Sequence, residues 1–212
     1  MSCVHEVSIQ EDKALEEAIV RAGEGHQGVP LGMAEIATAL YTRHLKFDAA
    51  DPTWPDRDRV VLSNGHGSML LYALQYLVGN QRITLDALRR FRELGSHCAG
   101  HPERDVQAGI EVTTGLLGQG IGHALGMAIA EASLNARFGD SLVNHRTWAF
   151  VGDGCLQEGV GQEMIALAVL RVVHRFDGRV IAVDDSEDAT VRQLFAQLFD
   201  RLSDLGPAVL WK

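Results

Sequence analysis

The sequence predicts an α/β fold in which a parallel sheet carries helices on both faces. Short apolar runs of strand length alternate with longer runs whose apolar residues recur every three or four positions. Two of the short runs end directly in glycine-rich turns, at Ser63 and at Gly152. Such alternation is typical of parallel sheets whose strands are connected by helices. Because the chain has 212 residues, 46% of them hydrophobic, we expect one core and a single domain over residues 1–212.

Each predicted helix is a run with apolar residues on a shared face, and glycine or proline breaks the run. In the first run, Leu15, Ala18 and Ile19 share a face before the glycine loop Gly25–Gly32. The predicted helices are Lys13–Ala22, Met33–Leu45, Ser68–Val78, Leu85–Leu94, Ile121–Phe138, Gln162–Val173 and Thr190–Leu205. The helix that begins at Ile121 is rich in alanine and methionine on nearly every side, which predicts that it is buried.

Short apolar runs bounded by turn residues are the predicted strands. They are Arg59–Leu62, Thr147–Val151, Arg179–Asp184 and Pro207–Trp211. Residues 95–119 form a long, glycine-punctuated connection with little periodicity, and such a loop in a compact domain is usually functional or disordered. Ligands of parallel sheets gather beyond the carboxyl ends of the strands, so we expect the site where the chain leaves Leu62 and Val151.

Composition excludes several classes of function. The formal net charge of -9 argues against a nucleic-acid partner, so contacts with phosphate must be local. Cys3, Cys98 and Cys155 are odd in number and lack metal-site spacing, which is typical of a reducing compartment. The first ten residues lack signal-peptide character, and no run of eighteen apolar residues occurs. We therefore expect a cytoplasmic protein without a membrane span.

The turn after the second predicted strand reads Gly-Asp-Gly and contains Asp153. Flanking glycines let the backbone turn sharply and approach a diphosphate, and the carboxylate is a hard oxygen ligand suited to Mg²⁺. The backbone amides of Gly152, Gly154 and Cys155 can bind phosphate oxygens at the start of a helical segment. The alternative is an ordinary strand-to-helix turn with a capping aspartate.

Four further glycine-rich segments precede this turn, and three of them carry a histidine. They are Gly25–Gly32, Leu62–Ser68, Ala99–Glu103 and Thr113–Gly120. In order and content, these segments and the Gly-Asp-Gly turn resemble the N-terminal, diphosphate-binding domain of the transketolase family. The resemblance extends from about Ala14 to Asp185. It is specific because five separate motifs recur in one order.

The resemblance implies thiamine diphosphate and Mg²⁺ as cofactors, with Asp153 as a metal ligand and His66 as a diphosphate contact. It also implies that His26 and His101 face the substrate and the reactive carbon, where histidines can move protons near neutral pH. For each histidine a local role remains the alternative: His66 as a capping residue at a strand end, and the other two as solvated loop residues.

The segment Gly115–Gly120 resembles the family segment whose backbone meets the aminopyrimidine ring of the cofactor. Gly115, Leu116 and Leu117 are therefore candidate cofactor contacts, and Leu116 stands where the family usually has proline. The alternative is a glycine-rich start of a helix. Glu158 either fixes the metal turn through a hydrogen bond or is a solvated carboxylate at a helix start.

The sequence departs from the family pattern toward its end. The family has Asp-Asp-Asn-Gly-Ile, whose asparagine completes the magnesium shell, and this chain has Asp185 followed by Ser186. Either residue is a candidate second ligand. A cofactor-covering loop with a further substrate histidine, and the middle domain that activates the aminopyrimidine, have no counterpart in the sequence. Since thiamine chemistry needs both halves, we expect the chain alone to be inactive.

The resemblance therefore predicts the diphosphate-binding component of an enzyme that transfers a two-carbon ketol unit between sugar phosphates. A separate pyrimidine-binding, C-terminal transketolase-like subunit would complete it in an oligomer. The main alternative is a noncatalytic, shortened domain that acts as an interaction or regulatory module. An unrelated phosphate-binding α/β protein would be expected to carry a Walker or dinucleotide glycine motif, and neither occurs in the sequence.

Overall fold

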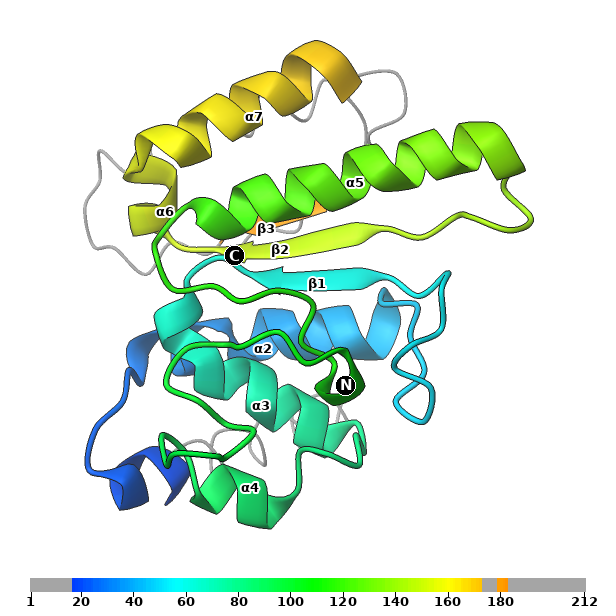
Figure 1. Cartoon of the computed structure of the whole chain (residues 1–212). Coiled ribbons are helices and arrows are strands. Elements are labelled where there is room, and N and C mark those ends of the chain that lie inside the picture. Colours follow the sequence, from blue (N-terminus) through cyan, green and yellow to red (C-terminus); the bar gives the residue numbers. More distant parts are fainter. Residues whose placement is uncertain (1–16, 173–178, 183–212) are drawn as a thin grey trace.

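A parallel sheet lies at the centre of the computed structural model, which describes residues 17–172 and 179–182 (Figure 1). Its strands β1 (Arg59–Leu62), β2 (Thr147–Val151) and β3 (Arg179–Ala182) lie in the order β1-β2-β3. Arg59 lies opposite Thr147 in the first pairing, and Trp148 lies opposite Arg179 in the second. The first two predicted strands are confirmed residue for residue, and the third is described as far as Ala182.

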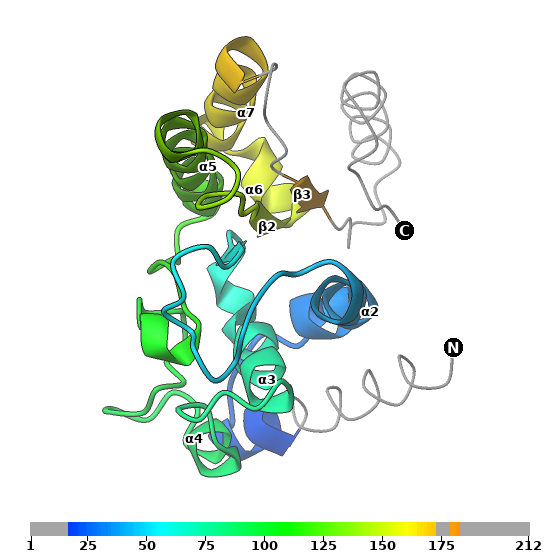
Figure 2. The ribbon, with the colours of Figure 1, turned by 90° about the vertical axis from the view of Figure 1, so that its right-hand side faces the viewer.

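Helices cover both faces of the sheet, as the sequence predicts. Figures 1 and 2 show α5 (Gln119–Phe138) and α7 (Gly159–Val172) on one side, and α2 (Gly28–Arg43) and α3 (Ser68–Leu77) on the other. The shorter elements are η1 (Gly65–Gly67), α4 (Leu85–Arg89), η2 (Val106–Ala108), α6 (Asp153–Gln157) and a helical segment over residues 17–22. None of the described helices has the length and apolar character of a membrane span.

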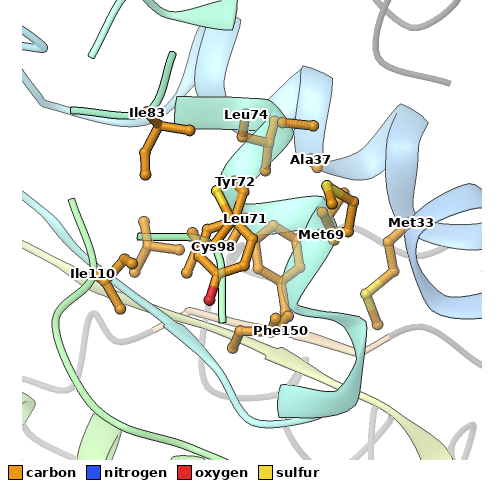
Figure 3. Packing of buried hydrophobic residues seen from close by; sticks show 14 of the residues in the cluster. Met33, Ala37, Met69, Leu71, Tyr72, Leu74, Ile83, Cys98, Ile110 and Phe150 are labelled. Atoms are coloured by element: carbon orange, nitrogen blue, oxygen red, sulfur yellow. The ribbon is translucent and has the colours of Figure 1, made fainter. Parts of the chain in front are cut away.

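The core divides at β2, all five residues of which are buried. Trp148 and Phe150 point into a large cluster with α2 and α3, and Figure 3 shows Phe150 beside Leu71 and Tyr72 of α3. Ala149 and Val151 belong to a second, smaller cluster with residues of α5 and α6. Successive side chains of a strand point to opposite faces, so an uninterrupted apolar run is what a strand covered on both sides requires.

Apart from shifts of one or two residues at helix ends, four predicted helices differ from the structure. Helix α7 begins at Gly159 rather than at Gln162. Helix α2 begins at Gly28 rather than at Met33, because proline suits the first turn of a helix and Pro30 lies there. Helix α4 ends at Arg89 rather than at Leu94, and Arg92 then adopts a positive φ of 66°. Helix α5 is predicted to be a buried helix, but only a stripe along it, including Ile121, Leu125 and Ala128, is buried.

The exposed side of α5 includes Ile129, Leu134 and Phe138, whose exposed fractions are 44%, 42% and 50%. The prediction was wrong because alanine and glycine on the outer face make the exposed side of the helix nearly as apolar in sequence as the buried side. The predicted helix Thr190–Leu205 and the predicted strand Pro207–Trp211 lie outside the described residues.

The long connection before α5 is packed against the domain by buried side chains. Cys98, Ala108 and Ile110 are buried in the large cluster, and burial raises the pKa of the Cys98 thiol to about 12. The carboxylate of Glu111 accepts two hydrogen bonds of 2.9 Å from the buried Arg57 guanidinium. Cys98 and Cys155 are both free and buried, which agrees with a structural role for each.

Asp58 joins two loops at the amino edge of the sheet. Its carboxylate accepts hydrogen bonds from the Lys46 amide (3.1 Å), the Arg146 amide (2.7 Å) and the Trp148 indole (2.9 Å). Lys46 lies in the segment before β1, Arg146 directly precedes β2 and Trp148 belongs to β2. Asp58 itself is 5% exposed. A buried carboxylate with three donors is well satisfied, and its removal leaves the donors without partners.

We expect Asp58→Ala to lower the free energy of unfolding of the full chain by about 3 kcal/mol, because charged hydrogen bonds are lost and buried donors are left unpaired. Urea denaturation followed by circular dichroism measures the change. Asp51→Ala is the matched control, since Asp51 is exposed and, among the described residues, accepts hydrogen bonds from Thr53 of its own turn. An equal loss in both variants would contradict the role assigned to Asp58.

The same edge should make the fold sensitive to acid. Burial opposes ionisation of Asp56, but hydrogen bonds from Lys46, Asn144 and His145 outweigh it and hold its pKa below the usual value. Burial, reinforced by the charge of Arg59, lowers the pKa of His145. Both groups bind protons more readily in the unfolded chain, so protonation favours unfolding.

We therefore expect stability to fall as the pH drops below about 6.5, through His145, and further below about 4, through Asp56. Urea denaturation at a series of pH values measures this profile. His145→Gln should flatten the profile between the two limits, whereas His123→Gln, at an exposed position, should not. A profile that His145→Gln leaves unaltered would contradict the assignment.

Candidate functional site

The predicted motifs meet at the carboxyl edge of β1 and β2. The chain leaves β1 at Ser63 and β2 at Gly152, and since the strands are parallel, both turns lie at the same edge (Figure 1). From this edge the chain enters η1 and α3 on one side and α6 on the other. This is the edge at which ligands of parallel sheets bind.

Glycines allow two of the segments to touch backbone to backbone. A Cβ atom at Gly120 of α5 would lie 2.5 Å from the Cα of Ser63, and one at Gly65 would lie 2.9 Å from the carbonyl carbon of Thr114. Real Cβ atoms do not approach backbone so closely, so any side chain at either position would push the segments apart. Gly65 and Gly120 therefore set the spacing between the turn after β1 and the segment 113–120.

The Gly-Asp-Gly turn contacts both of these segments. A Cβ atom at Gly152 would lie 3.5 Å from the side-chain Nδ2 of Asn64, and one at Gly154 would lie 3.0 Å from Cδ1 of Leu117. Gly118 has a φ of +82°, and its Cβ position lies 3.1 Å from the Cys155 carbonyl oxygen. Three motifs that are separate in the sequence thus form one contiguous edge.

The structure brings two of the three candidate histidines together. The rings of His26 and His66 have centroids 4.9 Å apart and cross at 67°. His66 is half-buried and His26 is exposed just before α2. The exposed His101 lies beside the other loop, since its Cδ2 is 3.7 Å from the Cβ position of Gly115. The three histidines therefore border the same edge of the sheet as the Gly-Asp-Gly turn.

Asp153 is the first residue of α6, and Gly152 is the N-cap. The Asp153 carboxylate accepts a 2.7 Å hydrogen bond from the Gly154 amide, and the Cys155 amide donates to the Gly152 carbonyl at 3.1 Å. Two of the three amides predicted to bind phosphate are thus engaged within the turn. Asp153 itself is partly exposed, as a ligand-binding carboxylate must be.

The remaining candidates differ in how far they face the site. Leu117 packs partly against the smaller core cluster, and the Leu116 side chain is 69% exposed. Glu158 is exposed at the C-cap of α6 and directly precedes α7, which agrees with a solvated carboxylate at a helix start. Asp185 and Ser186 lie outside the described residues. Within the described part of the chain, no three His, Cys, Asp or Glu side chains are grouped as a metal site.

Buried oxygen atoms without hydrogen-bond partners gather at this edge. Among the described residues four buried side-chain atoms lack a partner, and three of them belong to Ser63, Asn64 and Thr114. These residues are 0%, 1% and 3% exposed. Unpartnered buried polar groups are rare and costly, so their concentration here indicates a place where a polar ligand or water is bound.

Sequence reasoning did not select Ser63, Asn64 or Thr114 as site residues. Their segments were predicted to border the site, because Ser63 and Asn64 directly follow an apolar strand and Thr114 lies in the glycine-rich segment Thr113–Gly120. The burial of Thr114 itself follows from the approach of Gly65, which the sequence does not indicate. Magnesium commonly uses one or two carboxylates together with substrate phosphates, so Asp153 and this edge suit a phosphorylated ligand with Mg²⁺.

Fold and site together define a parallel α/β domain whose turns at the carboxyl ends of its strands suit a phosphorylated ligand. Residues 5–200 match the family described as transketolase, thiamine diphosphate binding domain, and the chain belongs to this family. The glycine-lined approach and the unpartnered oxygens fit such a cofactor.

Related sequences are transketolases. The chain is 58% identical over 152 residues to the transketolase of Rhodobacter capsulatus, which covers 72% of this chain and 23% of that protein. It is 51% identical over 175 residues to the transketolase of Cereibacter sphaeroides, which covers 82% of this chain and 26% of that protein. The chain thus spans about a quarter of the length of these curated relatives.

Solved transketolases share the fold. The enzyme of Leishmania mexicana superposes with a TM-score of 0.83 at 35% identity, over 98% of this chain and 35% of that chain. The Pichia stipitis transketolase in complex with sedoheptulose-7-phosphate gives a TM-score of 0.84 at 35% identity, over 97% of this chain and 31% of that chain. These similarities confirm the family predicted from the five motifs.

We expect Gly120→Ala to lower the free energy of unfolding by about 1–3 kcal/mol, because the new methyl group meets the Ser63 backbone. Gly126→Ala in the same helix is the matched control. Nothing lies within 4 Å of its Cβ position, so alanine should leave stability unchanged or raise it by up to about 1 kcal/mol. Urea denaturation measures both, and similar values would contradict the proposed close approach.

Proposed function

We propose that this chain is the diphosphate-binding component of a transketolase-like enzyme that uses thiamine diphosphate and Mg²⁺. The reaction would transfer a two-carbon ketol unit between sugar phosphates. One observation carries the proposal: five motifs converge at a sheet edge that holds three buried, unpartnered oxygens. Membership of the transketolase family and the sugar phosphate bound to the Pichia stipitis enzyme support the substrate class.

Asp153 is proposed as the carboxylate ligand of Mg²⁺, with Asp185 or Ser186 as the second ligand. The single carboxylate at the turn is sufficient, because Mg²⁺ usually keeps several waters and shares substrate phosphates. His66 is proposed to donate to the diphosphate. The Asp153–Gly154 hydrogen bond holds the carboxylate at the turn, so the ligand is positioned before the metal binds.

The backbone of Gly115, Leu116 and Leu117 is proposed to contact the pyrimidine ring of the cofactor. His26 and His101 are proposed to move protons to and from the substrate, since imidazole changes charge near neutral pH. When bound, thiamine diphosphate supplies the carbanion stabilisation that amino-acid side chains lack. The chain's own residues are proposed to bind and orient it.

A separate subunit is proposed to supply the pyrimidine-binding half. The chain aligns with about a quarter of the length of its transketolase relatives. The assembled enzyme would then be an oligomer in the cytoplasm. The second candidate is a noncatalytic domain that acts as an interaction or regulatory module. The serine at position 186, where the family has asparagine, favours this candidate because it weakens the second metal ligand.

Calorimetric titration of thiamine diphosphate with Mg²⁺ into the full chain, alone and with a candidate pyrimidine-binding subunit, tests the proposal. We expect binding heat at least in the presence of the partner, and ketol transfer only there. Absence of heat in both titrations would overturn the proposal that the chain is an enzyme component and would favour the noncatalytic module. Heat without transfer in the presence of the partner would overturn the reaction but retain the cofactor site.

We expect Asp153→Asn to weaken Mg²⁺-dependent cofactor binding about a hundredfold, because it replaces the anionic ligand with a neutral amide. The matched control is Asp86→Asn, an exposed aspartate in α4, which should bind as the unaltered chain does. The same calorimetry measures both. Unchanged affinity in Asp153→Asn would mean that the metal is bound elsewhere.

A further inference from the structure

Arg92 has an unusual backbone conformation next to the histidine loops. Among the described residues it is the one residue other than glycine with a positive φ, at 66°. This region is unfavourable for a side chain with a Cβ atom, and glycine or asparagine would adopt it more easily. The Arg92 amide donates to the Cys98 carbonyl at 2.9 Å, which holds the strained turn. Strain that is retained in this way calls for a role of the arginine side chain.

The Arg92 side chain contacts the loop that carries His101. A Cβ atom at Gly100 would lie 2.7 Å from Nη1 and 3.1 Å from Cζ of Arg92, so the guanidinium packs directly against the Gly100 backbone. On its other side Gly100 is held by α3, because the Ser68 hydroxyl donates to its carbonyl at 2.9 Å. The residue before His101 is thus fixed between Arg92 and Ser68.

The same side chain contacts the loop that carries His26. Arg92 Nε donates to the Glu24 carboxylate at 2.9 Å, two residues before His26. A second contact joins the same partners, since the Cβ position of Gly25 lies 3.3 Å from the ring of Phe91, the neighbour of Arg92. Phe91 is 3% exposed and belongs to the large core cluster. The loop is therefore attached to a rigid part of the domain.

Between these contacts lies an open pocket of about 390 Å³. Glu24, Arg92, Gly100 and His101 line it together with Glu103 and Thr113. Arg92 is the residue of this pocket that contacts both histidine loops. A planar guanidinium can donate hydrogen bonds to a carboxylate along one edge and pack on a peptide with its face, whereas lysine cannot do both.

We propose that Arg92 is a positioning residue that clamps the His26 loop to the His101 loop. The strained turn places the guanidinium between the two loops. The guanidinium binds Glu24 of the His26 loop, and Gly100 of the His101 loop packs against the same guanidinium. The expected effect of the clamp on catalysis rests on the proposed function. Its expected effect on the positions of His26 and His101 does not, and can be measured on this chain without a partner or cofactor.

Histidine ring NMR signals of the full chain test the clamp. In Arg92→Gly, which removes the side chain and the strain together, we expect the signals of both His26 and His101 to shift while that of His123 does not. Thermal stability should not fall, because the strain is relieved. Arg90→Ala is the control, since Arg90 pairs with Glu93 on the surface and should move neither signal. A fall in stability with unchanged signals would reduce Arg92 to a structural ion pair and overturn the proposal.

Milder changes separate the two arms of the clamp and do not threaten folding. Glu24→Ala should shift the His26 signal, whereas Glu24→Gln keeps an acceptor oxygen and should restore it. Gly100→Ala should shift the His101 signal in the unaltered chain but add nothing in Arg92→Gly, because its methyl group acts through the guanidinium. Additive shifts, or a Glu24→Gln variant that behaves as Glu24→Ala does, would overturn the clamp.

With the partner subunit present, Arg92→Gly should lower kcat for ketol transfer about tenfold with a smaller change in KM, because misplaced groups slow the chemical step. Cofactor binding by calorimetry should be retained. Histidine shifts without cofactor binding would support the clamp and overturn the proposed function. Cofactor binding with unshifted histidine signals would support the proposed function and overturn the clamp.

Discussion

The close approach of the backbone at Gly120 and Gly65 is the constraint on which the candidate site depends. Each glycine lies against backbone of another segment at a distance that admits no side chain. The approach brings the segment 113–120 onto the turn after β1, and through Gly118 and Gly154 onto the Gly-Asp-Gly turn as well. Because Gly120 and Gly65 meet backbone of the neighbouring segment, the amides and carbonyls of the turn after β1 and of the segment 113–120 lie close together.

The opposite edge of the sheet supplies the rigidity that such a site needs. Asp58 binds donors from two loops and from Trp148, and Trp148 also fills the large core cluster. The polar network and the core therefore share a side chain. The buried Arg57–Glu111 pair attaches the long connection to the same region, so the loop that carries His101 is held at both of its ends.

Much of the architecture could be predicted from local sequence. The strands at Arg59–Leu62 and Thr147–Val151 were found because both-sided burial demands an uninterrupted apolar run. The motifs also predicted where the histidines gather. The start of α2 at Gly28 was missed because its two glycines and proline were interpreted as a loop, although proline suits the first turn of a helix. The conformation of Arg92 and the burial of Thr114 depend on contacts between distant segments, which no local pattern encodes.

The uneven division of the core has a consequence for motion. Among the described side chains, the layer of α2 and α3 shares a large buried cluster, whereas α5 and α6 rest on a few residues such as Ile121, Val151 and Leu156. Fewer buried contacts mean a lower free energy of local opening, so amide hydrogens of α6 should exchange faster than those of α3. The Gly-Asp-Gly turn lies in this layer with fewer buried contacts. A cofactor bound there would slow that exchange, and part of its binding energy would be spent on ordering the layer.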